Sequence, residues 1–351
     1  MKKLLLILLC LPMIGFAQEN VRFSKTIIIE DLEKHLNILA SDSLEGRETG
    51  KPGQKMAANY IMNHFKNIGI PPYKRNTYYQ KFKAESDRHI CKYNCENCDE
   101  DFITRLFKKK RLVKGENVLG YIEGTDLKDE LIIITAHYDH LGKHDTLLFN
   151  GADDNGSGTA AVLEIAEAFM IAKKEEKGPR RSVLIMPVSG EEKGLLGSKH
   201  YADNPVYPLE STVANLNIDM IGRVDYYHDT SGYIYLIGSD MLSQELHDIS
   251  EEINKKYIGL DLDYTFNSED DPNRYYYRSD HYNFAKNNIP VIFYFNGLHD
   301  DYHKVTDTLE KIDFKKIETI TRLVFLTAWE LANRDERIVV DKKEELEKTS
   351  E

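Results

Sequence analysis

The chain has 351 residues, of which 41% are hydrophobic and 30% are charged, an ordinary composition for a soluble globular protein. This length accommodates one large α/β domain or two smaller ones. The formal net charge of −12 at pH 7 argues against a nucleic-acid partner, because phosphate binding requires a positive face. One basic run, KKKRLVK (108–114), lacks interleaved aromatic residues, and we interpret it as a solvated surface loop.

Residues 1–17 have the features of a secretory signal peptide. Lys2 and Lys3 precede the apolar run LLLILLCLPMIG, and a small residue stands before Gln18. The apolar run is too short to span a membrane. Leu9 stands where a lipoprotein signal needs a small residue, so we do not expect a lipid anchor at Cys10. The sequence therefore predicts an exported protein, periplasmic or secreted, without a stable membrane anchor. Cleavage would bring the net charge to about −14.

Two amphipathic helices are predicted next, over EDLEKHLNILAS (30–41) and KPGQKMAANYIMNHFKNIGI (51–70). Gly69 closes the second helix. Its apolar stripe consists of Met56, Tyr60, Ile61 and Phe65. These helices form a helical lead-in to the remainder of the chain.

A Cys- and Lys-rich insertion follows at about residues 86–114. It holds Cys91, Cys95 and Cys98, an odd number that leaves one thiol over after any disulfide. Three interpretations stay open: a disulfide plus a free thiol, a structural metal site that includes His89, and no bond at all.

Five later runs are apolar throughout, as in strands buried on both faces of a sheet. They are LIIITA (131–136), SVLIMPV (182–188), VANLNI (213–218), YIYLIG (233–238) and PVIFYF (290–295). Helical patterns lie between and after them. In the first, Val162, Ile165, Ala166 and Phe169 are expected to face inward, with Glu164 and Glu167 outward. Further helices are predicted within 241–257 and 313–333.

Strands that alternate with helices predict an α/β fold, with three layers (α/β/α) and a mostly parallel mixed sheet flanked by helices. We expect residues 18–333 to form one catalytic domain. Residues 334–351 are dense in charge and are predicted to be a disordered tail.

Unusual polar residues follow four of these strands. His137 and Asp139 end the first, Glu191 and Glu192 follow the second, Asp219 follows the third, and His303 comes after the last. Asp154 lies in a loop beyond the first strand. Ligands bind beyond the carboxyl ends of strands in open α/β sheets, so these side chains are expected to meet at one edge. So many carboxylates in one cleft need a cation. Histidine together with carboxylate, without thiolate, favours zinc or a similar transition metal.

Five motifs together resemble the secreted leucyl-aminopeptidase family of co-catalytic di-zinc metallopeptidases, whose relatives include glutamate carboxypeptidases and glutaminyl cyclases. The motifs are HYDHLG (137–142), GADDNGSGTAAVLE (151–164), GEEKGLLGS (190–198), LNIDMIG (216–222) and YHKVTDT (302–308). The resemblance extends from about residue 28 to residue 332. It implies a zinc-exopeptidase fold with two zinc ions per chain.

The resemblance also implies a role for each motif residue. Asp154 would bridge the two ions, His137 and Asp219 would bind one, and Glu192 and His303 the other. Glu191 would be the general base toward a hydroxide that bridges the metals, and the hydroxyl of Tyr302 would help to hold the oxyanion. Asp139 would accept a hydrogen bond from His137 and fix that ring. In this family the peptide bond after the bridging aspartate, here Asp154–Asn155, is typically cis.

Some residues near the motifs are interpreted as structural. Asp153 is given a helix-entry or turn role. Four histidines are interpreted as structural or surface groups: His140, His144, His281 and His299. The acidic loop SEDDPN (268–273) and its neighbouring tyrosines, Tyr275 to Tyr277, could shape a specificity pocket, but we interpret them as a solvated loop.

The resemblance implies an exported zinc-dependent exopeptidase, and an aminopeptidase acting on peptides is expected first. A carboxypeptidase would need a basic residue for the substrate carboxylate, and Arg278 is the candidate. A glutaminyl cyclase on the same fold would use a single zinc. The alternative of another class is a non-catalytic metal- or peptide-binding module, which would have no use for Glu191.

Overall fold

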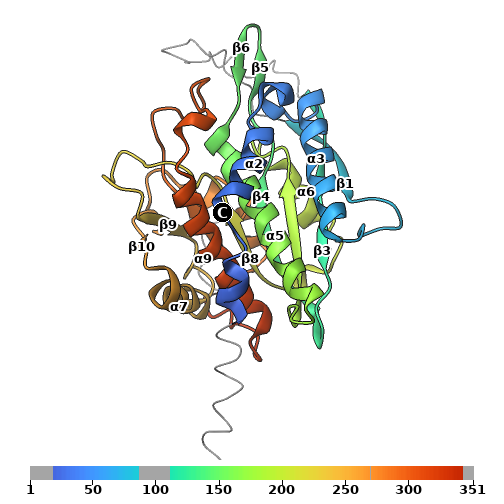
Figure 1. Ribbon diagram of the computed structural model, residues 1–351, viewed down its shortest axis with the longest axis vertical. Helices are drawn as coiled ribbons and strands as arrows, with labels where there is room; N and C mark the ends of the chain where they lie inside the picture. The colour runs from blue at the N-terminus through green and yellow to red at the C-terminus, as the bar shows by residue number, and fades with distance from the viewer. Residues whose placement is uncertain (1–18, 87–110, 269, 343–351) are drawn as a thin grey trace, which may run out of the picture.

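The computed structural model describes residues 19–86, 111–268 and 270–342 (Figure 1). The predicted signal peptide, the three cysteines with His89, and residues 343–351 of the predicted tail lie outside the described residues.

The seven-stranded sheet at the centre of the fold has the order β10-β9-β11-β8-β4-β7-β3. Neighbouring strands from β11 through β8 and β4 to β7 are parallel, as are β9 and β10, whereas β9–β11 and β7–β3 are antiparallel. The sheet is therefore mixed and mostly parallel, as predicted. Its strands are β3 (Gly120–Ile122), β4 (Leu127–His137), β7 (Arg181–Val188), β8 (Thr212–Ile218), β9 (Tyr233–Ile237), β10 (Asp261–Asp263) and β11 (Val291–Phe295).

Helices cover both faces of this sheet, which gives the predicted three layers. Side chains alternate along β4: Ile132 and Ile134 pack into one core, while Leu131 and Ile133 pack into the other. Figure 1 shows the first layer in front of the sheet. It contains α2 (Ile29–Leu39), α3 (Pro52–Ile68), α5 (Gly158–Lys174), α7 (Gln244–Ile253) and α9 (Phe314–Asn333). The second layer contains α6 (Leu196–Asp203) and α8 (Tyr282–Ala285).

Helix α5 corrects one prediction. It lies between α2, α3 and α9, so nearly its whole circumference is buried. Glu164, expected to face outward, is 2% exposed and lies with Oε1 3.1 Å from Nε2 of His35. The prediction that Val162, Ile165, Ala166 and Phe169 face inward is confirmed, because all four are buried. The helical spacing of the apolar residues could not show that other helices cover the opposite side of α5.

Two antiparallel pairs of strands were not predicted. Strand β1 (Tyr79–Ser86) pairs with β2 (Arg111–Val118), and β5 (Gly142–His144) pairs with β6 (Leu147–Phe149). The basic run 108–114, interpreted as a loop, therefore continues into a strand from Arg111 onward. A search for continuous apolar runs misses β2 because polar residues interrupt its KGENV segment. It misses β5 and β6 because each has only three residues.

The beginning of the predicted disordered tail is ordered against the domain. Ile338 is 3% exposed, Arg337 donates to the carbonyl oxygens of Glu210 and Thr212, and Arg334 pairs with Glu245. Arg334 and Arg337 therefore attach this segment to the domain.

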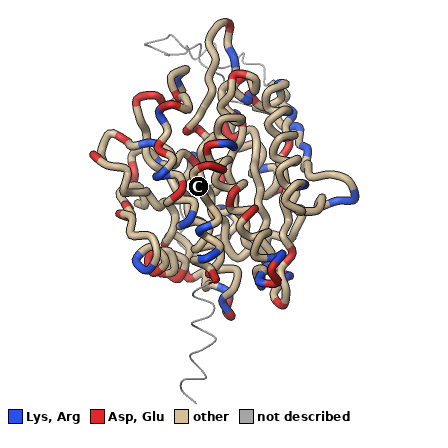
Figure 2. The backbone as a smooth tube through the Cα atoms, in the orientation of Figure 1, with Lys and Arg blue, Asp and Glu red and all other residues tan. Residues whose placement is uncertain are grey.

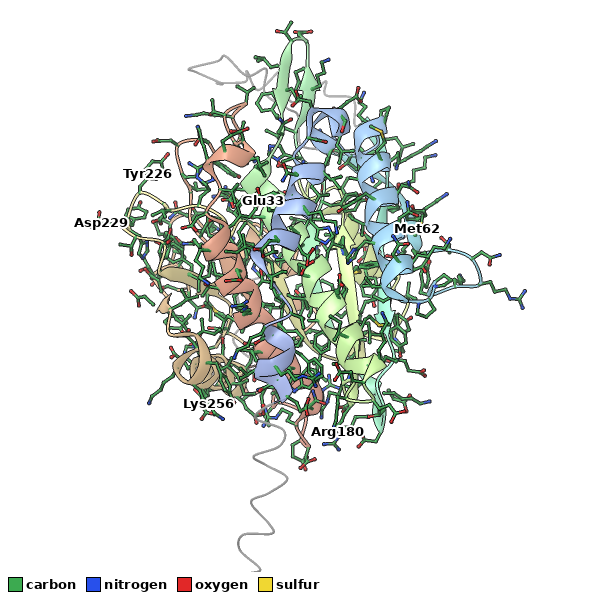
Figure 3. All side chains as sticks on the ribbon, in the orientation of Figure 1. Glu33, Met62, Arg180, Tyr226, Asp229 and Lys256 are labelled. Carbon is green, nitrogen blue, oxygen red and sulfur yellow. The ribbon has the colours of Figure 1, made fainter. Side chains whose placement is uncertain are left out.

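The carboxyl ends of the parallel strands point to the top of the view. The β5–β6 hairpin, which follows β4, stands at the top of Figure 1, whereas Arg180, just before β7, is labelled near the bottom of Figure 3. Lys and Arg residues are interspersed with Asp and Glu residues along the backbone (Figure 2). None of the helices within the described ranges combines the length and the apolar character that crossing a bilayer requires.

Candidate metal centre

Most of the predicted site residues lie at or beyond the carboxyl ends of neighbouring strands, whereas Asp154 lies in the turn before α5. His137 is the last residue of β4, Asp219 directly follows β8, and Glu191 and Glu192 follow β7. His303 lies in the loop after β11 with φ of 56°. Since β7, β4, β8 and β11 are adjacent and parallel, their ends meet at one edge, as predicted.

Asp154 lies between two groups of donor atoms and presents a different oxygen to each. Its Oδ1 lies 3.4 Å from Nε2 of His137, which in turn lies 3.1 Å from Oδ1 of Asp219. Its Oδ2 lies 3.1 Å from Nε2 of His303, which lies 3.4 Å from Oε1 of Glu192. One buried carboxylate therefore faces both groups at once.

The backbone around Asp154 is fixed by a second carboxylate. Asp307 accepts the N–H of Asp153 at 3.0 and 3.1 Å through its two oxygens, and the N–H of Asp154 at 3.1 Å. Asn155 donates to the carbonyl oxygen of Ile218 at 2.8 Å, which ties this loop to the end of β8. The Asp154–Asn155 peptide bond is cis. Asp307 was quoted within a motif but given no role, because nothing local in YHKVTDT shows where its side chain points.

Asp153 is structural, but its partners are distant in sequence rather than in a local turn. Oδ1 accepts the N–H of Gly222 at 2.6 Å, and Oδ2 lies 3.1 Å from Nε2 of His299. It thereby joins three loops of the edge. His299 is structural, as interpreted, and so is His281, which is fully buried and stacks on Phe293.

His140 is the site residue that sequence reasoning missed. It was interpreted as structural or surface, yet its Nδ1 lies 3.1 Å from Oε1 of Glu192 and 3.7 Å from Oδ2 of Asp154. Its position three residues after His137 was the available signal, since both residues belong to the turn that leaves β4.

The resemblance implies that the carboxylate of Asp139 accepts a hydrogen bond from His137, but the structure shows a different contact. Nδ1 of His137 makes its hydrogen bond with the backbone carbonyl oxygen of Asp139 at 3.1 Å, and the carboxylate oxygen is 3.8 Å away. That carboxylate instead accepts Thr49 Oγ1 at 2.6 Å and the N–H of Glu191 at 3.3 Å. Asp139 therefore links the His137 turn to the loop that carries Glu191.

The electrostatics of the centre favour a bound cation. Burial lowers the pKa of His303, but the carboxylates of Glu192 and Asp154 outweigh burial and raise this pKa to about 11. The pKa of His137 is likewise raised, because Asp219 and Asp154 outweigh burial. Burial raises the pKa of Asp154, yet the surrounding imidazoles hold it well below its usual range. These negative charges would be matched by a cation in place of the imidazole protons.

The donor set fits zinc. Imidazole nitrogen and carboxylate oxygen are ordinary zinc ligands at about 2.0–2.2 Å, and ligands in a tetrahedron around such an ion are about 3.3–3.6 Å apart. Four distances across the centre, quoted above, lie between 3.1 and 3.4 Å. Oε1 of Glu192 is also buried without a hydrogen bond from any described residue, as expected for an atom reserved for an ion.

A cleft opens beside the donor groups. Glu191 and Tyr302 line it together with His137, Asp154, Asp219 and His303. Burial, with the charges of Asp154 and Glu192, raises the pKa of Tyr302 well above its usual value, so its hydroxyl stays protonated. The remaining wall is mainly apolar and consists of Met220, Tyr275, Phe293, Phe295 and Leu298, with Arg278 at one side.

Tyr275 corrects part of the loop interpretation. It follows the acidic segment 268–273 and was considered with it, and it is 6% exposed in the wall of the cleft. The guanidinium of Arg278 lies 4.9 Å from the centre of the Tyr275 ring, while the side chain stays exposed.

A three-layer α/β/α fold with carboxylates and imidazoles gathered beyond its parallel strands is typical of metal-dependent hydrolases. Residues 117–328 match the family described as Peptidase family M28. The chain is 31% identical over 290 residues to a probable leucine aminopeptidase of Trichophyton verrucosum, covering 80% of this chain and 74% of that protein. The chain therefore belongs to peptidase family M28.

Other relatives agree with this assignment. Aminopeptidase YwaD of Bacillus subtilis is 26% identical over 246 residues, which are 68% of this chain and 49% of that protein. Among solved structures, the Legionella pneumophila LapA aminopeptidase superposes with a TM-score of 0.68 over 91% of this chain and 75% of that chain, at 21% identity. BSAP, a zinc aminopeptidase from Bacillus subtilis, gives 0.67 over 90% and 99%, at 18% identity. At these identities the two structures establish the fold.

Proposed function

We propose that this M28 peptidase is an exported aminopeptidase that holds two zinc ions and removes N-terminal residues from peptides. The observation that carries the proposal is Asp154, whose two oxygens face separate donor groups. His137 and Asp219 would bind the first ion with Oδ1 of Asp154. Glu192 and His303 would bind the second with Oδ2. The names of the relatives support the aminopeptidase activity.

Zinc, when bound, polarises the scissile carbonyl and makes a water molecule acidic enough to attack near neutral pH. The protein contributes the proton transfers. Glu191, 6% exposed and lining the cleft beside His137 and Asp154, would accept a proton from the attacking water on a carboxylate oxygen. It would then deliver that proton to the nitrogen of the leaving amine. Its backbone N–H, held by Asp139, fixes the loop from which the carboxylate reaches the cleft.

Tyr302 would donate a hydrogen bond to the oxygen that becomes negatively charged. Its hydroxyl remains protonated in this environment, and its ring stacks on His303 with 3.8 Å between ring centres. A donor held in place before the reaction stabilises developing charge without reorganisation.

The lining of the cleft suits an apolar N-terminal residue. The carboxylates of Glu191 and Asp219 in the lining would attract a free α-ammonium group, and the apolar residues Phe293 and Phe295 would accept a hydrophobic side chain.

Two dipeptides of the same residues test the reaction. Leu-Phe-amide has a free amine and a blocked carboxylate, whereas N-acetyl-Leu-Phe has the reverse. The proposal expects hydrolysis of the amide only, abolished by a chelator and restored by zinc. Hydrolysis of neither peptide by zinc-loaded protein would contradict it, and cyclisation of an N-terminal glutamine would point to a glutaminyl cyclase.

A carboxypeptidase is the second candidate, and Arg278 is the observation that favours it. Its exposed guanidinium borders the cleft and is available to a substrate carboxylate. Hydrolysis of N-acetyl-Leu-Phe that falls at least about tenfold in Arg278→Gln would support this reaction, since an ion pair with carboxylate contributes roughly 1.5–3 kcal/mol. Arg274→Gln, which removes another exposed arginine four residues earlier, is the matched control.

Export is proposed from the N-terminal segment, with its two lysines, apolar run and small residue before Gln18. Expression of the full chain, followed by N-terminal sequencing of the exported protein, tests this. A first residue at or near Gln18 supports export, and an intact Met1 in the cytoplasmic fraction contradicts it.

A further inference from the structure

His140 is held rigidly at the metal centre by the backbone of the turn after β4. Its N–H donates to the carbonyl oxygen of Arg47 at 3.4 Å, and the residue forms a bridge with Glu48. Its ring packs so closely against Gly151 that a Cβ there would lie 2.5 Å from ring atoms. The ring is 0% exposed and meets that of His303 edge to face.

The ring nitrogens of His140 lack the partners that a buried structural histidine normally has. Among the described residues, neither Nδ1 nor Nε2 makes a hydrogen bond. Nδ1 comes within 3.1 Å of Oε1 of Glu192, but the two groups are not aligned as a hydrogen bond requires. Leaving such a group buried and unsatisfied is costly, so each case calls for an explanation. Both ring nitrogens of His281 also lack a hydrogen bond within the described chain, but that ring stacks on Phe293. His140 differs because its ring lies beside two carboxylates.

Four donor atoms lie at this side of the centre; those of His140, Asp154 and Glu192 lie within 4.8 Å of one another, and that of His303 lies beside the two carboxylates. They are Oδ2 of Asp154, Oε1 of Glu192, Nδ1 of His140 and Nε2 of His303. Nδ1 of His140 lies 3.1 Å from Oε1 of Glu192 and 3.7 Å from Oδ2 of Asp154. Nε2 of His303 lies 3.4 Å from Oε1 of Glu192 and 3.1 Å from Oδ2 of Asp154. A tetrahedral zinc site has separations of about 3.3–3.6 Å between ligand atoms, given bonds of about 2.0–2.2 Å.

We propose that His140 is a ligand of the second metal ion, so that Asp154, Glu192, His303 and His140 together bind it. This inference rests on the proposed two-ion centre. It makes the two ions unequal. The second is enclosed by four protein donors, as in structural zinc sites, whereas the first has three and keeps a position open for substrate. The second ion is therefore the tightly held one.

Two substitutions separate ligation from a supporting role. His140→Ala removes the ring, and His140→Asn keeps an amide that can donate to Glu192 but is a poor zinc ligand. His200→Ala, on the partly exposed surface of α6, is the matched control. Competition with a chelator measures both zinc affinities. The proposal expects the tighter one to fall at least tenfold in both variants and to be unchanged in His200→Ala.

A spectroscopic count gives a readout that does not depend on the variants being stable. Proton NMR of the wild-type protein with cobalt in both sites should show three strongly shifted exchangeable imidazole resonances, from His137, His140 and His303. His140→Ala should show two. Two resonances in the wild type, or an affinity restored by His140→Asn, would overturn the proposal. A wild type that binds only one ion or none would instead refute the two-ion function, so the two failures are distinguishable.

Discussion

Two buried clusters of titratable side chains in this protein behave in opposite ways. In the helix layer, each nitrogen of His35 has a partner: Nδ1 lies 2.6 Å from the Tyr60 hydroxyl and Nε2 lies 3.1 Å from Glu164. Burial lowers the pKa of His35 to about 4 and raises that of Glu164 to about 8, so both are neutral at pH 7. At the metal centre, the carboxylates of Asp154 and Glu192 instead keep their charges, since surrounding imidazoles outweigh burial.

The difference shows that burial and shifted pKa values alone do not identify a functional site. The His35 cluster is satisfied within itself and needs no further group. The metal centre holds several carboxylates around three imidazoles and leaves Oε1 of Glu192 without a hydrogen bond from the described chain. Substitutions in the two clusters should therefore have different consequences: loss of metal and turnover in one, altered stability in the other.

The largest effect is expected from Asp154→Asn. The amide cannot present two anionic oxygens, so both donor groups lose their shared ligand. Zinc content should fall from two ions toward none, and hydrolysis should fall by more than the roughly 10²–10⁴-fold that a lost general base costs. Elemental analysis and peptide hydrolysis measure the two quantities. Retention of two tightly bound ions would contradict the bridging role.

Glu191→Gln should keep both ions and lose most turnover, by about 10²–10⁴-fold, because the amide cannot accept the proton of the attacking water. The zinc content of the same preparation serves as the control. Near-normal turnover at full zinc loading would show that another group is the base.

Asp307→Asn should have an intermediate effect. Asp307 is not among the proposed ion ligands, but it accepts the N–H groups of Asp153 and Asp154. Supporting residues of this kind typically contribute about 10–100-fold in metal affinity. Chelator competition should show that loss, while Asp313→Asn, at the start of α9, should leave the affinity unchanged.

The smallest effect is expected from Glu164→Gln, in the other cluster. The folded-state pKa of Glu164, about 8, lies above its ordinary value, so the folded protein holds this proton at neutral pH. Its contribution to stability is therefore lost as pH rises from the ordinary glutamate pKa through the folded value of about 8. Between pH 6.5 and about 8.5 the loss is on the order of 2 kcal/mol, and glutamine removes this dependence. Thermal unfolding of both proteins across this range measures the difference. Parallel curves would contradict the assignment, and unchanged zinc content is expected throughout.

The sequence predicts the sheet better than it predicts the environment of single side chains. Apolar runs such as 131–136 and 182–188 identify buried strands, and parallel order then places the polar residues after them at one edge. Glu164 and His140 were misjudged because their neighbours come from elsewhere in the chain. The side of α5 that carries Glu164 is closed by other helices, and His140 is directed toward Glu192 by a turn that is paired with Glu48.

The most direct test of the central claim is the number of zinc ions per chain, measured by elemental analysis of the purified mature protein after mild dialysis. Two ions are expected, because Asp154 faces two donor groups, and about one should remain after brief chelation, since the second site has the additional imidazole of His140. No zinc, even after the metal is added back, would contradict the account.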